Sequence, residues 1–182
     1  INEDNIDVVY NGANEIYMTT SEEDKTATRE KYAAGNPYFL FIGSLLPRKN
    51  IANLFRAFDL FKSNSNNQVK LMIIGEKKWW TSEIENAYKE MKFKDDVIFK
   101  GHTAPDELKF IIPAALAMTY VSFFEGFGIP IIEAMKCGTP VITSDTSCMP
   151  EIAGGAALLC DPNSPDSIAQ RMSDVANSTD NN

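Results

Sequence analysis

The sequence contains few of the residues that brace small proteins through covalent or metal bonds. Among its 182 residues are three cysteines and one histidine, and no two cysteines have C-x-x-C spacing. Disulfide frameworks and structural zinc sites need several such residues at short spacing. We therefore expect no metal site and a fold held together by a hydrophobic core, which a chain of this length can bury.

Basic residues and long apolar runs are also scarce. The chain has 17 Lys and Arg against 25 Asp and Glu, which gives a formal net charge of -8. Because proteins bind nucleic acids largely through Lys and Arg, this charge argues against a nucleic-acid partner. No apolar run approaches the roughly 20 residues of a membrane-spanning helix, so no transmembrane segment is expected. The cysteine usage predicts a cytoplasmic protein, and the start at Ile1 predicts that the natural N-terminus is missing.

Short β-rich runs alternate along the chain with longer segments of helical period. The expected strands are residues 7–10, 38–42, 70–74, 97–100, 118–121, 141–143 and 157–159. The expected helices are residues 50–62, 82–92, 105–115, 130–136 and 165–177. Strand and helix alternation of this kind predicts an α/β fold, a Rossmann-like parallel sheet with helices on both faces.

The loops that follow the predicted strands are rich in glycine and hold two basic pairs. Ligands of open parallel sheets bind beyond the carboxyl ends of the strands, so these loops are the place to look for a site. Arg48 and Lys49 stand directly before a helix start and are expected to bind a diphosphate. For Lys77 and Lys78 the favoured interpretation is ordinary solvated charge.

The stretch from Glu125 to Glu133 surrounds a Gly-Phe-Gly turn and a proline. Pro130 fits the first position of a helix, which leaves free amides before it that attract an anion. Gly126 and Gly128 remove side chains that would keep a ligand from the backbone. Glu133 is then expected in the first helical turn.

Each glutamate taken singly has a simple interpretation: Glu133 would complement the helix dipole, and Glu125 would be a solvated loop residue. With Arg48 and Lys49 nearby, both carboxylates are expected to stay ionised. This argues against a glycoside hydrolase, whose general acid needs a raised pKa. Ionised carboxylates accept hydrogen bonds from hydroxyl groups. Cations and amides for a diphosphate, beside two acceptors for hydroxyls, fit a nucleotide sugar.

Together these motifs resemble one known family. The stretch from Glu125 to Val141 resembles the E-x7-E signature of retaining glycosyltransferases of family four (group 1), which have the GT-B fold. Residues 8–12, 41–50 and 149–162 resemble further segments in the same order. The resemblance is to the C-terminal half of such enzymes. It implies that residues 1–182 form a donor nucleotide-sugar-binding domain, without the N-terminal acceptor domain and the final C-terminal crossover helix.

The resemblance also implies residue roles. Glu125 would contact hydroxyls of the donor sugar and Lys49 would neutralise the leaving diphosphate, so both are the expected catalytic residues. Glu133 would hold the ribose. The other expected donor-binding residues are Gly43, Ser44, Arg48, Gly126, Phe127, Gly128, Ile129 and Pro130. Many relatives have arginine at the position of Ser44, and Arg48 is expected to supply that charge.

The implied reaction transfers a sugar from a nucleoside-diphosphate sugar to an acceptor hydroxyl with retention. No D-x-D cluster is present to hold a metal on the diphosphate, so the reaction is expected to need neither a metal nor a cofactor. The implied partners are the donor, the protein's own N-terminal domain and an acceptor glycan or lipid-linked glycan, with the parent protein at the inner face of the membrane. The isolated chain is expected to bind nucleotide without turnover.

Two other functions remain open. The first is a non-catalytic nucleotide-binding or interaction module. The second is a dinucleotide-binding oxidoreductase domain, although Ile131 stands where that fingerprint has its third glycine. His102 is a secondary candidate for contact with the nucleotide, with solvent exposure as the alternative. Trp79 and Trp80 are candidates for stacking on a base or an acceptor, with packing against a helix or the absent half as the alternative.

Overall fold

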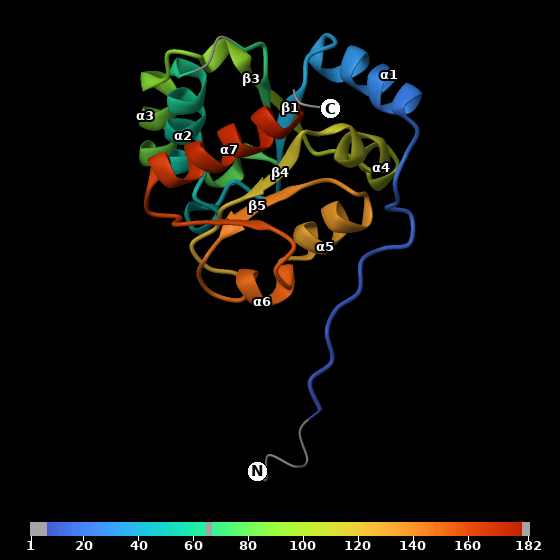
Figure 1. Ribbon diagram of the computed structural model, residues 1–182. Coiled ribbons are helices and arrows are strands. Elements are labelled where there is room, and N and C mark those ends of the chain that lie inside the picture. The colour runs from blue at the N-terminus through green and yellow to red at the C-terminus, as the bar shows by residue number, and fades with distance from the viewer. Residues whose placement is uncertain (1–6, 65–66, 180–182) are drawn as a thin grey trace.

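The computed structural model describes residues 7–64 and 67–179 of the chain. The strands in these ranges form one parallel six-stranded sheet with the order β3-β2-β1-β4-β5-β6 (Figure 1). The strands are β1 (Tyr38–Ile42), β2 (Lys70–Ile74), β3 (Val97–Gly101), β4 (Ala117–Tyr120), β5 (Val141–Ser144) and β6 (Leu158–Cys160). This is the strand order of a doubly wound, Rossmann-like fold, and it confirms the predicted fold class.

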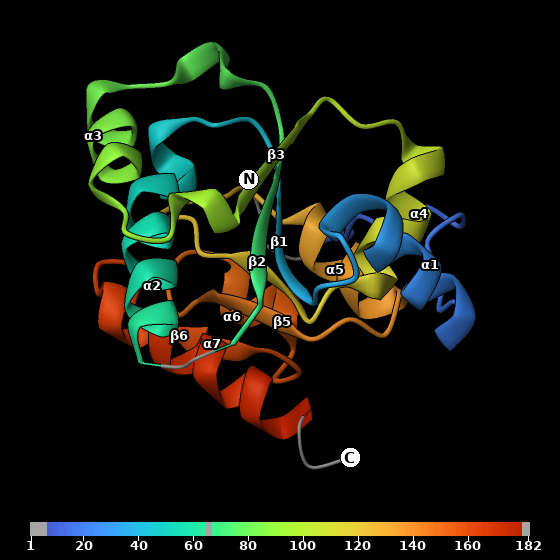
Figure 2. The ribbon, with the colours of Figure 1, turned by 90° about the horizontal axis from the view of Figure 1, so that it is seen from above.

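Helices cover both faces of the sheet, as Figure 2 shows from above. The helices are α1 (Glu22–Ala33), α2 (Ile51–Ser63), α3 (Ser82–Glu90), α4 (Pro105–Ala114), α5 (Ile129–Lys136), α6 (Met149–Ala153) and α7 (Pro165–Thr179). Helices α2, α3 and α7 pack on one face, and α1, α4 and α5 pack on the other. Each face therefore has its own hydrophobic cluster.

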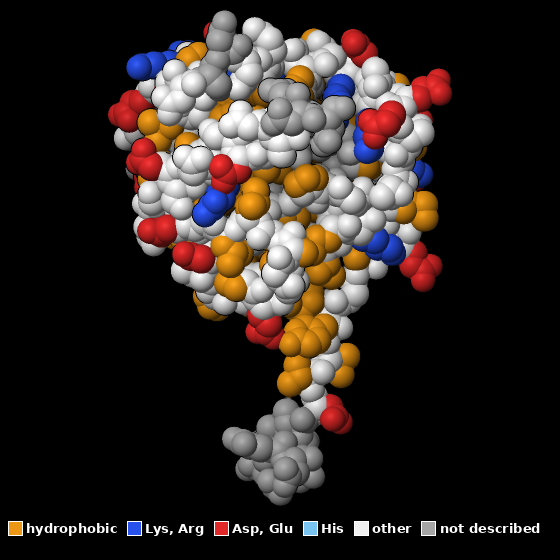
Figure 3. Space-filling view, in the orientation of Figure 1, with side chains coloured by type: hydrophobic (Ala, Val, Ile, Leu, Met, Phe, Trp, Pro, Cys, Tyr) orange, Lys and Arg blue, Asp and Glu red, His pale blue; other side chains and the backbone are white. Residues whose placement is uncertain are grey.

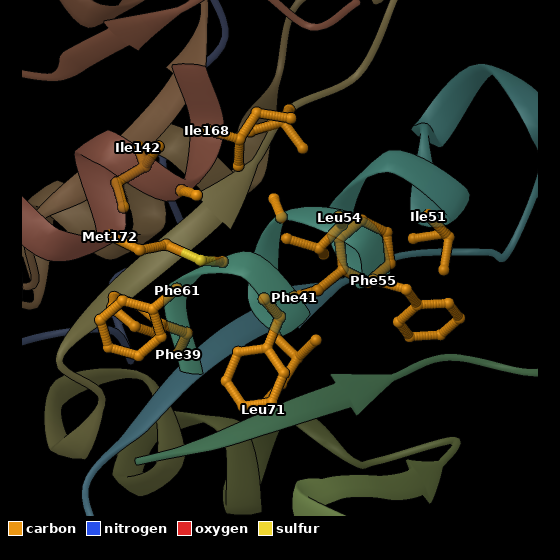
Figure 4. Close-up of a cluster of buried hydrophobic side chains, with 14 of the residues drawn as sticks. Phe39, Phe41, Ile51, Leu54, Phe55, Phe61, Leu71, Ile142, Ile168 and Met172 are labelled. Atoms are coloured by element: carbon orange, nitrogen blue, oxygen red, sulfur yellow. The ribbon is translucent and has the colours of Figure 1, made fainter. Parts of the chain in front are cut away.

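The central strand β1 contributes to both clusters because its side chains alternate. Phe39 and Phe41 point toward α2 and α7, whereas Tyr38 and Leu40 point toward α1 and α4, and all four are fully buried. Figure 4 shows the first cluster, in which Phe61 of α2 lies against Phe39, with ring centroids 5.3 Å apart. Apolar burial of this kind, at about 25 cal/mol per Å², is the main stabilising contribution to the fold.

The predicted strand at residues 7–10 is wrong. No strand forms there, and Val8 and Val9 are 76% and 88% exposed on a segment that runs away from the body (Figure 1). β-branched residues favour a strand only where a neighbouring strand supplies hydrogen bonds and packing. We call residues 7–12, all of which are exposed, the N-terminal arm.

Two helices were not predicted. Helix α1 buries only Thr28 and Ala33 of its own residues, so its sequence has no apolar stripe. It is stabilised instead by the Ser21 N-cap, whose hydroxyl accepts from the amide of Asp24, and by acidic residues in its first turn. Helix α6 is five residues long, which is too short for a periodic pattern.

Candidate functional site

The candidate residues lie where the strand order of the sheet reverses. Strands β1 and β4 are neighbours, but the helices that follow them, α2 and α5, pack on opposite faces. A crevice opens at such a switch point, outside the carboxyl ends of the strands, and it is where ligands of doubly wound folds bind. Residues 43–50 leave β1 there and residues 121–128 leave β4, so the two predicted segments are neighbours in space.

Hydrogen bonds hold these two segments together. The side-chain amide of Asn50 donates to the backbone oxygens of Val121 at 2.9 Å and Pro162 at 2.7 Å. The backbone amide of Phe123 donates to the carbonyl of Arg48 at 2.9 Å. Asn50 is buried and has a left-handed backbone, with φ of 61°, that turns the chain into α2. The loop after β1 is therefore fixed against the end of β4.

Glu125 forms ion pairs with both predicted cations. Its Oε2 lies 2.7 Å from Arg48 Nη1, and its Oε1 lies 2.7 Å from Lys49 Nζ. Glu125 and Lys49 are both buried, whereas the Arg48 side chain is 46% exposed. Lys49 Nζ also donates to the Tyr120 hydroxyl at 2.6 Å, and its contact with Oε1 lacks the angle of a hydrogen bond. We call Arg48, Lys49 and Glu125 the ion cluster.

Burial and charge act in opposite directions within the ion cluster. Burial lowers the pKa of Lys49, and the neighbouring Glu125 partly offsets that effect. Burial also acts to raise the pKa of Glu125, but the adjacent Lys49 and Arg48 outweigh it and hold that pKa below its usual range. Glu125 is therefore ionised at neutral pH, as the sequence predicted.

The loop beyond Glu125 is shaped by glycine and enters α5. Gly128 is the N-cap of α5 with φ of 101°, and an added Cβ would lie 3.1 Å from Ile131 Cδ1. Nothing lies within 4 Å of a Cβ added at Gly126, so that backbone faces open space. The helix begins at Ile129, one residue earlier than predicted, and the amide of Ile131 donates to the carbonyl of Gly128 at 2.9 Å. Pro130 is consequently the second helical residue.

Glu133 differs from its prediction in two respects. It lies beyond the first turn of α5, because the helix starts earlier than predicted. Burial raises its pKa, and neither Arg48 nor Lys49 forms an ion pair with it. Tyr17 and Cys137, both neutral at pH 7, lie near it instead; the pKa of Tyr17 is raised to about 12 by burial and then by Glu133. The prediction that the same two cations keep both glutamates ionised is therefore wrong for Glu133.

Two residues that the sequence did not single out, Ser147 and Cys148, contact the backbone of the loop that contains Glu125. Ser147 Oγ donates to the carbonyl of Glu125 at 3.0 Å. Cys148 Sγ lies 3.2 Å from the carbonyls of both Glu125 and Phe127. The signal that could have identified Ser147 and Cys148 is position, because they follow β5 at the same edge of the sheet.

A second depression, which we call the three-loop hollow, lies beside the ion cluster and has a volume of about 340 Å³. It is lined by the loops after β1, β2 and β3, including Gly43, Ser44, Glu76, Trp79, His102 and Thr103. Gly43 lies at both the three-loop hollow and the ion cluster, because a Cβ built there would lie 3.8 Å from Lys49 Nζ. Gly43, Ser44 and His102 therefore lie together, at one side of the predicted phosphate site.

The two tryptophans and the two lysines near them have different environments. Trp80 packs among aromatic rings, with centroids 5.8 Å from Phe99 and 6.1 Å from Phe55, whereas Trp79 is 60% exposed. Lys77 is exposed, as predicted for a solvated charge, and its Nζ also lies 3.8 Å from the centroid of the Phe99 ring. Lys78 is solvated, as predicted, and pairs with Glu76 at 2.6 Å.

Two further features concern metals and membranes. Among the side chains of residues 7–64 and 67–179, no group of three His, Cys, Asp or Glu is placed to hold a metal ion. Within the same ranges, no helix combines the length and the apolar character that crossing a membrane requires.

A doubly wound sheet with cations at its switch point is typical of domains that bind phosphorylated ligands. Residues 24–182 match the family model described as Glycosyl transferases group 1, and the chain belongs to this family. The O-antigen chain mannosyltransferase B of Escherichia coli is 33% identical over 157 residues, which cover 86% of this chain and 41% of that protein.

Solved structures have the same fold. Anabaena Alr3699/HepE in complex with UDP-glucose aligns with a TM-score of 0.82 at 23% identity, over 96% of this chain and 48% of that chain. The C-terminal domain of LpcC, a group 1 family glycosyl transferase from Francisella tularensis, aligns with a TM-score of 0.77 at 19% identity. That alignment covers 93% of this chain and 90% of the LpcC domain.

The comparisons confirm the predicted family and the likeness to one half of a GT-B fold. Membership of the group 1 family also argues against the alternative of an oxidoreductase domain. The chain spans less than half the length of the curated mannosyltransferase it matches, of which it covers 41%.

Proposed function

We propose that this chain binds the nucleoside-diphosphate sugar of a retaining glycosyltransferase, and that the rest of the protein binds the acceptor. The observation that carries the proposal is the ion cluster, which gathers Arg48, Lys49 and Glu125 at the switch point of the sheet. The chain has a net charge of -8, so two cations held together at the ligand-binding edge are a local exception.

Donor binding exchanges the partners of the ion cluster. The diphosphate takes Arg48 and Lys49 as counterions, helped by the amides at the start of α5. The half-exposed Arg48 side chain can turn toward the ligand, whereas Lys49 is held in place by Tyr120. Glu125, released from its cations, then accepts hydrogen bonds from sugar hydroxyls. Glu133, which is half buried and forms no ion pair among the described residues, is proposed to hold the ribose.

In the transfer step, the bond between the anomeric carbon and the diphosphate oxygen breaks and a bond to the acceptor oxygen forms on the same face. The acceptor proton passes to the departing phosphate oxygen. Lys49 and Arg48 stabilise the negative charge that develops on the diphosphate, so we propose that no metal ion and no cofactor take part. The protein contributes positioning and electrostatic stabilisation.

The acceptor is proposed to be a glycan or lipid-linked glycan of bacterial polysaccharide assembly, which the O-antigen mannosyltransferase relative supports. A lipid-linked acceptor would place the whole protein in the cytoplasm, at the inner face of the membrane. Without the acceptor domain, the chain is expected to bind nucleotide but not to turn over.

Removing the Lys49 charge tests the donor site. We expect Lys49→Met to weaken binding of nucleoside diphosphates by about tenfold or more, because a desolvated contact to phosphate is lost. Calorimetry with UDP, GDP and ADP measures this. Lys62→Met is the matched control, because Lys62 is also buried and ion-paired, with Asp96 at 2.8 Å, but lies away from the switch point. Equal losses in the two variants would contradict the proposal, as would binding of NAD in place of these nucleotides.

A further inference from the structure

The three-loop hollow has the dimensions and walls of a site for a flat ring. Its volume is about 340 Å³, and its lining includes Gly43 and Gly75, which directly follow β1 and β2, and Gly101, the last residue of β3. Gly75 cannot be replaced there, because a Cβ would lie 1.9 Å from the carbonyl oxygen of Gly43. Glycine backbone therefore forms part of the lining, and a planar ligand can approach it closely there.

Trp79 is an unpaired aromatic wall of this hollow. Its indole is 60% exposed and has no ring contact among the described residues, whereas its neighbour Trp80 is packed among three aromatic rings. An exposed indole at the wall of a hollow is a surface on which a planar ligand can stack. Nucleobases stack on such side chains, with about 1–3 kcal/mol per base.

Two polar groups in the hollow are available to a ligand. Thr103 is 5% exposed, and its buried hydroxyl has no hydrogen-bond partner among the described residues. Glu76 lines the same hollow and, within the part of the chain that the structure describes, forms an ion pair only with Lys78, a side chain that is 73% exposed. Exposed ion pairs contribute little, so a ligand can replace Lys78 at small cost. An orphaned hydroxyl and an accessible carboxylate are what a base with both acceptors and paired donors would satisfy.

The hollow also lies at the right place for the base of the proposed donor. Gly43 lines the hollow and stands beside Lys49 of the ion cluster. A nucleoside diphosphate with its phosphates at Lys49 would thus have its base end near this depression.

We propose that the three-loop hollow binds guanine, with Trp79 stacked on the ring and Glu76 accepting hydrogen bonds from N1–H and the N2 amine. This rests on the proposed donor function and adds the identity of the base. Guanine presents two adjacent N–H donors, which match the two oxygens of one carboxylate. Uracil has a single N–H between two carbonyl oxygens, and adenine has its amine beside a ring acceptor. Each would direct a lone pair at Glu76.

The first test measures binding of GDP, UDP and ADP to this chain by calorimetry. GDP is expected to bind at least about tenfold more tightly than either competitor, because each competitor leaves a carboxylate oxygen unsatisfied. The Trp79→Ala variant is expected to lose about tenfold in GDP affinity, and Trp79→Phe to retain most of it. Phe110→Ala, at an exposed aromatic residue of α4, is the control and should bind GDP as the native chain does.

The decisive variant is Glu76→Gln, which keeps the shape of the side chain but replaces one acceptor by a donor. We expect it to lose about tenfold in GDP affinity and to change UDP affinity by less than twofold. Glu90→Gln, at an exposed carboxylate of α3, is the control. Thermal unfolding of each variant checks that the fold is intact.

The outcomes separate this inference from the proposed function. If UDP or ADP binds as tightly as GDP, or if Glu76→Gln leaves GDP affinity unchanged or weakens GDP and UDP equally, the guanine assignment is overturned while donor binding stands. If none of the three nucleotides binds, both proposals are overturned.

Discussion

At the scale of single residues, the two glutamates of the E-x7-E segment have opposite electrostatic environments. Glu125 is buried beside two cations and its pKa is lowered, whereas Glu133 is half buried without an ion pair among the described residues and its pKa is raised. A carboxyl group with a lowered folded-state pKa stabilises the protein above its unfolded pKa, and this stability is lost as pH falls through the folded value. A carboxyl group with a raised folded-state pKa has the opposite effect, because it lowers the stability of the protein as pH rises above its unfolded pKa.

This contrast predicts opposite pH responses for two matched variants. Between pH 3 and pH 7, Glu125→Gln should become less stable relative to the native chain, with most of the change below the ordinary carboxyl pKa of 4.5, because Lys49 and Arg48 lose an ionised partner. Over the same range, Glu133→Gln should become more stable relative to the native chain, because it never carries the buried charge. Urea denaturation at the two pH values measures both. Parallel responses of the two variants would show that the assigned environments are incorrect.

The residues of the site were predictable to different degrees. Arg48, Lys49 and Glu125 could be placed together because strand ends of a parallel sheet share one edge. Their mutual pairing could not be predicted, since it depends on Asn50, which the sequence suggested as an ordinary helix start. In the structure, the Asn50 amide instead bridges Val121 and Pro162, two partners more than 70 positions away.

At the scale of elements, the two glycines before α5 have different roles: Gly128 is required by the backbone conformation, and Gly126 leaves space for a ligand. Gly128 has a left-handed φ and a close neighbour in Ile131, whereas Gly126 is open. We expect Gly128→Ala to lose about 1–2 kcal/mol of stability, and Gly126→Ala to keep stability within about 0.5 kcal/mol.

For nucleotide-sugar affinity the order of the two variants is expected to reverse, with the larger loss in Gly126→Ala. The methyl group of Gly126→Ala projects into the space proposed for the donor, so affinity should fall although the fold is unchanged. Urea unfolding and calorimetry, applied to both variants, test this crossed pattern. Unchanged affinity in Gly126→Ala would remove the donor from that face of the loop.

Buried elements were predicted well because they carry their pattern in their own residues. Strands β1 and β2 match the predicted ranges fully, and the other sheet strands differ by one residue at one or both ends. The failures are elements whose stability comes from elsewhere. Helix α1 packs against α4 with few apolar residues, and residues 7–10 have strand propensity but no neighbouring strand.

At the scale of the whole molecule, the N-terminal arm exposes apolar side chains that the body does not cover. Figure 3 shows hydrophobic side chains gathered along the segment that leaves the body, which includes Val8, Val9 and Tyr10. The Tyr10 hydroxyl donates to Glu151 at 2.5 Å, and the Tyr10 ring is 6.1 Å from that of Phe127. The arm therefore meets the body next to the loop of the ion cluster.

We expect the arm to promote self-association of the chain without contributing to its fold. The double variant Val8→Ser, Val9→Ser should lower concentration-dependent association in sedimentation velocity and leave stability within about 0.5 kcal/mol. Met18→Ser, at an exposed residue beyond the arm, is the control and should associate as the native chain does. A large loss of stability in the double variant would show that the arm belongs to the folded core.

The ion cluster has a final consequence for how an acidic molecule accepts a polyanion. While the crevice is empty, Glu125 serves as a resident surrogate for phosphate, so Lys49 is never left as an uncompensated charge in the interior. When the diphosphate binds, it replaces the carboxylate as the partner of the cations, so the cations are paired both before and after binding. The affinity of this protein for its ligand therefore depends on how well the diphosphate competes with Glu125 for the two cations.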